Sequence, residues 1–159
     1  VHMKNNKGFT LIELIATITI LSIIMLVAIP NIMGISIKSK NRTYINDANK
    51  LVTLVKYKFE SDPNINKPTG STCVRINLAN LDQTELKTGP ENGNYDLTNS
   101  YVVIRYNSTS HKYEYKVQLK EVYGTNKAKG VPLTDYNNIL GYNDKSSLIK
   151  TSGWQNDCS

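Results

Sequence analysis

Residues 9–37 read FTLIELIATITILSIIMLVAIPNIMGISI and contain a single charged side chain, Glu13. Ten of the residues from Leu14 to Ile29 are Leu, Ile or Val. At roughly 0.3 to 0.6 kcal/mol for each such residue near a helix centre, they favour insertion into a bilayer by about 3 to 6 kcal/mol. Glu13 opposes insertion, but the cost of a carboxylate falls toward the end of a span, where Glu13 lies. The stretch therefore predicts a membrane-spanning helix.

The alternative interpretation of this stretch is a secretory signal peptide that is removed after export. The uncharged part, residues 14–37, is long enough at about 1.5 Å per residue to cross a hydrocarbon layer of about 30 Å. A signal peptide has an apolar region of about 7 to 15 residues, followed by a cleavage site between small residues. Here the run is longer, carries an acid near its start and ends in PNIMG (residues 30–34) without a clear cleavage site. A retained helix is the favoured interpretation.

After Ile37 the apolar residues narrow to one stripe at helical spacing. Successive members are three or four residues apart and charged residues lie between them, as in an amphipathic helix. The helix is expected to end at Asp62, because a residue before proline is pushed out of the helical region. We therefore expect a nearly continuous helix over 9–62, with a kink or local loss of helix near Pro30 and Gly34. The stripe consists of Ile45, Ala48, Val52, Val55 and Phe59.

The remaining residues, 63–159, predict a small α+β domain. Leu78, Leu81 and Leu86 allow a short helix over 80–87. Alternating apolar residues predict two strands, over 100–107 and 112–120, joined by a turn at 108–111, and one more short strand is expected after Gly124. An antiparallel hairpin packed on the amphipathic helix is the simplest assembly of these elements. The expected fold class is therefore α+β, with a long N-terminal helix whose second half lies on a small antiparallel sheet.

The N-terminus carries a motif that is specific to one family. Residues 4–13, KNNKGFTLIE, resemble the prepilin peptidase motif of type IV pilins and pseudopilins: a short basic leader, Gly8, an aromatic first mature residue Phe9, and Glu13 at the fifth mature position. Pro30 also falls where those proteins carry a proline. The resemblance implies cleavage between Gly8 and Phe9 by a prepilin peptidase on the cytoplasmic side, with N-methylation of Phe9.

The resemblance also implies a division of the chain and a set of partners. The expected segments are a leader (1–8), a membrane and fibre-core helix (9–37), an amphipathic helix (38–62) and a globular head (63–159). The precursor would be a single-pass protein of the inner, or cytoplasmic, membrane, and a pilus assembly platform would move it into an extracellular fibre. Its partners would be other copies of itself and related pilins, besides the peptidase and the membrane.

Glu13 has a specific expected role. An isolated carboxylate among apolar residues is costly in a dry environment unless a cation meets it. Cleavage creates such a cation, the amino group of Phe9, and in the family the pair is proposed to form between neighbouring subunits during assembly. The alternative is that Glu13 reaches the lipid headgroups and only marks the end of the span.

The distribution of basic residues does not agree with the membrane orientation that the motif implies. Lys4 and Lys7 precede the apolar run, whereas three basic residues follow it, so the positive-inside count does not support a cytoplasmic leader. We follow the motif, because the Gly8–Phe9 junction makes sense only if it faces a cytoplasmic peptidase. The three residues that follow the run are Lys38, Lys40 and Arg42.

Cys73 and Cys158 are the two cysteines of the chain. If the head lies outside the membrane, a disulfide between them is favoured and would tie the C-terminal tail to the start of the head. So long a loop would contribute about 4 kcal/mol in the chain-entropy description. Many pilins use a C-terminal disulfide over a shorter loop, so this connectivity departs from the usual one. Two free thiols are the alternative.

Catalytic, metal-binding and nucleic-acid-binding functions find little support. The formal charge of +6, from 19 basic and 13 acidic residues, is a weak argument for nucleic acid. Two histidines and two distant cysteines do not suffice for a zinc site, so no metal or cofactor is expected. His111 is expected to lie exposed in its turn. Asp82, Glu85 and Glu91 are interpreted as a helix cap and a solvated loop.

The favoured function is a structural one, with no enzymatic activity: a major or minor type IV pilin that serves surface adhesion or twitching motility. A pseudopilin of a type II secretion or DNA-uptake machine shares the same N-terminus and is the first alternative. A membrane-anchored surface protein that never polymerises is the second. Contact of exposed tyrosines and lysines with DNA, a polysaccharide or a host surface is left open by the sequence.

Overall fold

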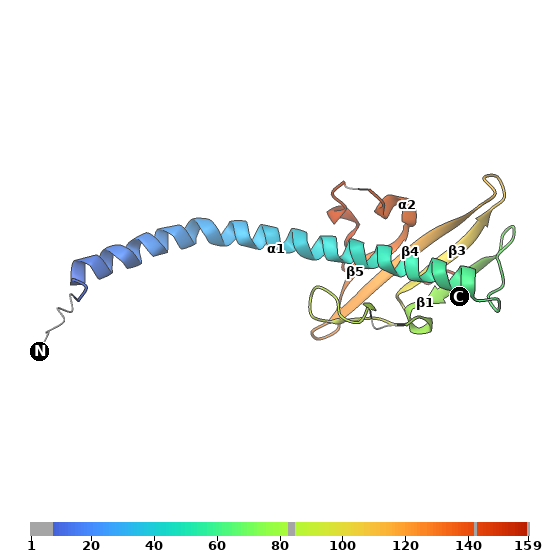
Figure 1. Cartoon of the computed structure of the whole chain (residues 1–159), viewed down its shortest axis with the longest axis horizontal. Coiled ribbons are helices and arrows are strands. Elements are labelled where there is room, and N and C mark those ends of the chain that lie inside the picture. Colours follow the sequence, from blue (N-terminus) through green and yellow to red (C-terminus); the bar gives the residue numbers. More distant parts are fainter. Residues whose placement is uncertain (1–7, 83–84, 142, 159) are drawn as a thin grey trace, which may run out of the picture. The chain divides into compact units, whose positions relative to one another are not determined.

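The computed structural model describes residues 8–82, 85–141 and 143–158 (Figure 1). The chain divides into two compact units, Val1–Ile37 and Lys38–Ser159, which are considered one at a time. Helix α1 (Leu11–Ser61) contributes to both, which confirms the long N-terminal helix. The second unit adds a small antiparallel sheet, which confirms the α+β class.

The helix of the first unit is continuous at the place where a kink or a local loss of helix was expected. The segment Leu11–Ile37 stays helical through Pro30 and Gly34. Pro30 cannot donate to the carbonyl four residues earlier, but this removes only one backbone bond. The neighbouring Asn31 side-chain amide donates to the Val27 carbonyl at 3.3 Å and adds a polar contact in the affected turn. In the single chain, therefore, the expected local loss of helix is absent from this described segment.

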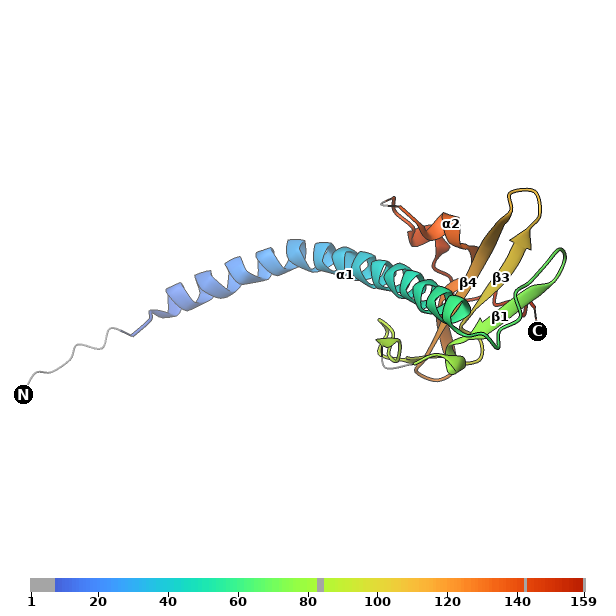
Figure 2. The same ribbon diagram turned by 45° about the vertical axis from the view of Figure 1, so that its right-hand side comes forward.

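The sheet contains five described strands, all paired antiparallel. Strand β4 lies at its centre and pairs with β2, β3 and β5, while β1 pairs with β3. Figure 2 shows β1, β3 and β4 side by side and the short helix α2 (Tyr136–Ile139) next to β4. The strand bounds are β1 Cys73–Asn77, β2 Asn94–Tyr95, β3 Tyr101–Asn107, β4 Lys112–Tyr123 and β5 Lys127–Asp135.

The predicted hairpin is confirmed as β3 and β4, with Tyr106 opposite Tyr113 and a turn at 108–111. The short strand expected after Gly124 is β5. The short helix expected over 80–87 is replaced at its start by a 3-10 turn, η1 (Leu78–Asn80), and part of it, residues 83–84, lies outside the described residues. A further 3-10 turn, η3, covers Ser146–Leu148.

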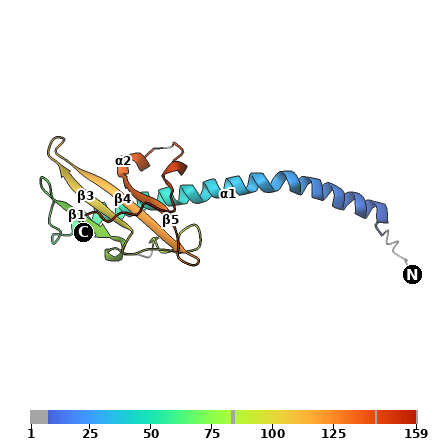
Figure 3. The same cartoon turned by 180° about the vertical axis from the view of Figure 1, so that it is seen from behind.

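The core of the second unit lies between α1 and one face of the sheet. The C-terminal half of α1 crosses this face, in front of the strands in Figure 1 and behind them in Figure 3. The predicted apolar stripe is buried as expected, and Tyr44 and Leu51 extend it. Opposite the helix, the sheet contributes alternate residues of β3 and β4, namely Val102, Ile104, Val117 and Leu119.

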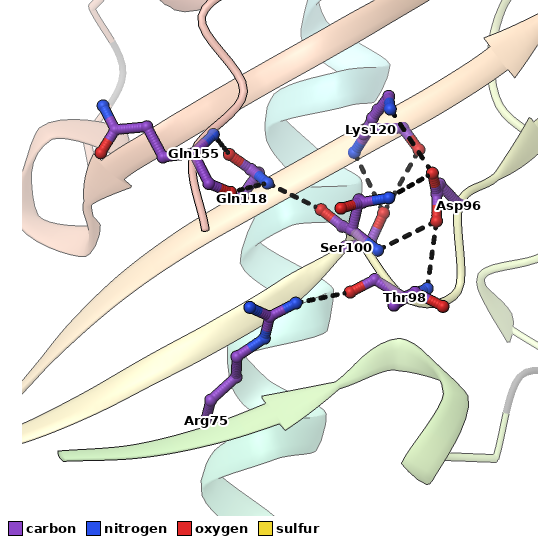
Figure 4. A network of polar contacts seen from close by, with 8 residues as sticks. Arg75, Asp96, Thr98, Ser100, Gln118, Lys120 and Gln155 are labelled. Carbon is purple, nitrogen blue, oxygen red and sulfur yellow. Dashed lines mark hydrogen bonds and ion pairs between the residues drawn. The ribbon is translucent and has the colours of Figure 1, made fainter. Parts of the chain in front are cut away.

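The C-terminal tail covers the other face of the sheet. Gln118 on β4 is fully buried, and its side-chain amide exchanges two hydrogen bonds with the backbone of Gln155, at 2.9 and 3.1 Å (Figure 4). The Tyr101 hydroxyl donates to the Gln155 carbonyl at 2.7 Å. The predicted disulfide between Cys73 and Cys158 is present and joins the end of the tail to the edge strand β1. The tail is thus fixed to the sheet by both covalent and polar contacts.

A buried polar cluster holds the loop at residues 89–93 against the helix and the sheet. The Glu121 carboxylate is fully buried and accepts from the Tyr44 hydroxyl, from the Gly93 N–H at 2.7 Å and from the Glu91 N–H at 3.0 Å. A side chain at Gly93 would place its Cβ 2.2 Å from the Val122 carbonyl oxygen, so this approach requires glycine.

The expectation that Glu91 belongs to a solvated loop is wrong. Its side chain is 17% exposed and accepts from the ammonium groups of Lys40 and Lys129, each at 2.7 Å. These lysines come from α1 and β5, which are far from the loop in sequence. The carboxylate therefore connects three segments of the second unit.

Because Lys129 and Lys40 hold the pKa of Glu91 below its usual value, this cluster should make stability sensitive to acid. A lowered pKa in the folded state contributes stability above about pH 4.5, and that contribution is lost as the pH falls through the folded-state pKa. We expect Glu91→Gln to be less stable than the wild type by about 1 to 3 kcal/mol at pH 7, and by less at pH 3. Urea unfolding of the full chain in detergent across this range measures both.

The matched control for this prediction is Glu85→Gln. Glu85 pairs with Lys50 at 3.1 Å, but both side chains are half exposed, so the change should alter stability by less than about 1 kcal/mol. Equal pH profiles for the wild type and Glu91→Gln would contradict an acid-sensitive cluster.

Candidate functional site

The start of α1 is organised around Thr10 and Glu13. The Glu13 N–H donates to Oγ1 of Thr10 at 3.3 Å, and in return Oε2 of Glu13 accepts from the Thr10 N–H at 2.8 Å and the Thr10 hydroxyl at 2.9 Å. This reciprocal arrangement is a capping box, which satisfies donors that a helix leaves unpaired at its N-terminus. Sequence reasoning missed it, although Thr-x-x-Glu before an apolar run is its known signature. Glu13 is therefore partnered within its own chain.

The predicted cleavage junction lies directly before this cap. Gly8, Phe9 and Thr10 have no regular secondary structure, and all three are exposed. Phe9 is 84% exposed. The basic leader residues Lys4 and Lys7 lie outside the described residues. The described part of the junction is thus irregular in structure and accessible to solvent.

The apolar helix that follows is uncovered. Within residues 8–37 no side chain is buried, and the large apolar ones are between 49% and 84% exposed. Part of α1 is long and apolar enough to cross a membrane, with a window of 18 residues at a mean hydropathy of 2.6. A soluble monomer rarely exposes so large an apolar surface, so this surface needs to be covered by lipid or by other helices.

The basic residues after the apolar run are largely compensated inside the second unit. Lys40 pairs with Glu91, as described above. Asp144 hydrogen-bonds to Ser146, and the charges of Lys38 and Arg42 help to lower the pKa of Asp144. The positive-inside rule counts Lys and Arg alone, so these acids do not remove the disagreement between the count and the orientation that the motif implies.

Comparison with known proteins places these features in one family. The family model for the prokaryotic N-terminal methylation motif matches residues 3–29, which include the junction, the cap and most of the apolar helix. The type IV wide pilus major component PilA4 of Thermus thermophilus is 32% identical over 133 residues, which cover 79% of this chain and 92% of that protein. The chain belongs to the type IV pilin family. No solved structure matches it.

The chain is therefore a structural protein of a family whose members assemble with other pilin copies. Its predicted functional residues fall into two groups in the structure. Gly8, Phe9 and Glu13 lie within a few residues of the helix start, whereas Cys73 and Cys158 form a staple in the head. Pro30 and Gly34 lie inside the exposed helix and meet neither group in the chain. The two groups therefore lie in different units of the chain.

Proposed function

We propose that this pilin is made as a membrane-anchored precursor, cleaved after Gly8, methylated at Phe9, and polymerised through its helix 9–37 into an extracellular fibre. A prepilin peptidase performs the cleavage and an assembly platform the transfer. The observation that carries the proposal is the uncovered apolar helix. Lipid tails are as apolar as the side chains of neighbouring helices. Moving the apolar helix from lipid into a fibre core therefore changes its hydrophobic free energy little.

Glu13 is the one group for which this transfer is expensive, because it leaves the aqueous or headgroup zone for a dry interior. The amino group of Phe9 in a neighbouring subunit would compensate its charge. Both side-chain bonds to Thr10 use Oε2 of Glu13, so Oε1 remains available to such an amine. The cap and the inter-subunit pair are therefore compatible.

Pro30 and Gly34 are proposed to act during assembly rather than in the single chain. The missing donor of Pro30 and the permissive backbone of Gly34 lower the cost of opening the helix between them. A local opening would let each subunit bend to follow its neighbours, while the second unit, Lys38–Ser159, stays intact. The segment limits 1–8, 9–37, 38–62 and 63–159 follow from the same proposal.

A major pilin is the favoured subunit type, because the relative from Thermus thermophilus is described as a major pilus component. Its fibres would serve surface adhesion or twitching motility. A pseudopilin of a secretion or DNA-uptake machine is the competing function, since it would use the same N-terminal chemistry.

The deciding measurement is the N-terminal mass of protein sheared from the cell surface, together with imaging of the cells. We expect long fibres whose subunit begins at Phe9 and carries one methyl group. Gly8→Leu, which places a bulky side chain at the junction, should leave an uncleaved membrane protein and no fibres. Short assemblies that stay within the envelope would indicate a pseudopilin. Monomers that keep their leader in the wild type would contradict the proposal.

A further inference from the structure

The second unit contains an open groove that the assembly proposal does not use. It lies where the first half of β4, helix α2 and one residue of α1 meet, and it has a volume of about 690 Å³. This volume is within the range of small-ligand sites, roughly 300 to 1,000 Å³. All of its lining residues belong to the second unit.

Three tyrosines form the aromatic part of the groove, and their rings are held in place. The ammonium of Lys56 lies 4.7 Å from the ring centre of Tyr115 and 4.5 Å from that of Tyr136. Tyr113 packs edge-on against Phe59, with ring centres 5.1 Å apart. Each of the three tyrosines is only partly buried. A ligand would therefore meet preorganised aromatic surfaces, which reduces the ordering cost of binding.

The polar side chains of the groove have unused hydrogen-bonding capacity. Among the described residues, the side-chain amides of Asn137 and Asn138 have no protein partner, nor do the hydroxyls of Tyr115 and Tyr136. Asn137 and Asn138 are also exposed on α2. A side-chain amide offers two donors and one acceptor oxygen, so Asn137 and Asn138 can donate hydrogen bonds to ligand hydroxyl groups and accept hydrogen bonds from them.

The charges of the groove balance. Lys56 and Lys112 contribute two positive charges, and Glu114 and Asp135 contribute two negative ones. A polyanion such as DNA gains affinity mainly from several uncompensated cations that displace its counterions. A balanced groove lacks this gain, so an uncharged ligand is favoured over a nucleic acid.

From aromatic surfaces, free amides and hydroxyls, and neutral charge together, we propose that this groove binds an uncharged oligosaccharide. A pyranose ring presents apolar C–H groups on its faces and hydroxyls around its rim. The C–H groups would lie against the parts of the tyrosine rings that Lys56 and Phe59 leave exposed, and the hydroxyls would bond to Asn137 and Asn138. The inference deepens the adhesion role and rests on the proposed function only for its setting, because a fibre would display many copies of the groove.

The test uses the full chain in detergent micelles, so that binding is measured without assembly. The probes are four uncharged hexasaccharides, namely cellohexaose, maltohexaose, mannohexaose and N-acetylchitohexaose, with the single-stranded oligonucleotide (dT)12 as the charged competitor, all followed by titration calorimetry. We expect at least one hexasaccharide to bind and (dT)12 not to compete. Tyr115→Ala should weaken binding by about tenfold.

Two further variants separate recognition from folding. The double change Asn137→Ala and Asn138→Ala alters only exposed side chains and should weaken binding by about threefold or more. Tyr57→Ala is the matched control, because Tyr57 is 74% exposed on α1 and does not line the groove, and it should leave affinity unchanged. Three results would each overturn the inference: none of the four sugars binds, sugar binding is unchanged in both groove variants, or only (dT)12 binds. Fibre assembly is scored separately by shearing, so failure of one proposal leaves the other intact.

Discussion

A chain with Glu13→Ala is expected to be processed after Gly8 and inserted into the membrane, yet to yield surface fibres reduced by about tenfold or more. The alanine leaves the amino group of Phe9 in the neighbouring subunit without a counter-charge in a dry fibre core. An unpaired charge in such a place costs far more than the same charge at a wet membrane surface. The measurement is the amount of pilin in sheared surface fractions, compared with the amount in membranes.

The capping box makes a sharper variant available. Glu13→Gln keeps an acceptor at the third helical position, and glutamine is accepted there in a capping box, so the bonds with Thr10 survive while the charge is lost. If the inter-subunit pair is the role of Glu13, Gln and Ala should reduce fibre yield alike. If Gln supports normal fibres while Ala does not, the cap alone explains the residue and the ion pair is contradicted.

The alternative role of Glu13, as a marker of the span's end, gives a different result. A carboxylate that only reaches the headgroups is replaceable, and its loss makes the helix more apolar and its insertion easier. Fibre yield would then be equal in the wild type and in both variants. The three outcomes, loss in both, loss in Ala alone and loss in neither, thus correspond to three distinct roles.

The long helix and the hairpin could be predicted because their signals are local and periodic. The stripe from Ile45 to Phe59 repeats at helical spacing, and Tyr113 to Leu119 alternate as a strand does. Strands β1 and β2 were missed because five and two residues are too short to show a period. Their pairing with β3 and β4 depends on contacts across the fold rather than on neighbouring residues.

The candidate site shows the same division between local and distant signals. Gly8, Phe9 and Glu13 could be found because the motif is contiguous, whereas the role of Thr10 depends on its hydrogen bonds with Glu13. Glu91 was misplaced because the lysines that partner it lie 51 and 38 residues away. The groove could not be foreseen either, since Lys56 and Tyr136 meet Tyr115 only after α1 and α2 pack on β4.

Loss of the disulfide should cause the largest change in stability of the head. Cys73 and Cys158 are 85 residues apart, and closing so long a loop restricts the unfolded chain by about 4 kcal/mol in the chain-entropy description. For a head of this size, that corresponds to a melting temperature lower by roughly 10 to 20 °C. We expect this shift in Cys158→Ser, in the double variant Cys73→Ser/Cys158→Ser and in the reduced wild type, all followed by circular dichroism in detergent.

The tail also has a role that the disulfide alone does not explain, because its backbone bonds to Tyr101 and Gln118, which are fully buried on the outer face of the sheet. Tyr101→Phe removes the hydroxyl that donates to Gln155 and keeps the staple, so it should cost only about 1 kcal/mol. If the staple works mainly by constraining the unfolded chain, reduction should add its full effect to that of Tyr101→Phe, since the two act on different states. If reduction instead leaves the melting temperature unchanged, the disulfide contributes nothing to stability, and the polar contacts of the tail suffice to hold the tail on the sheet.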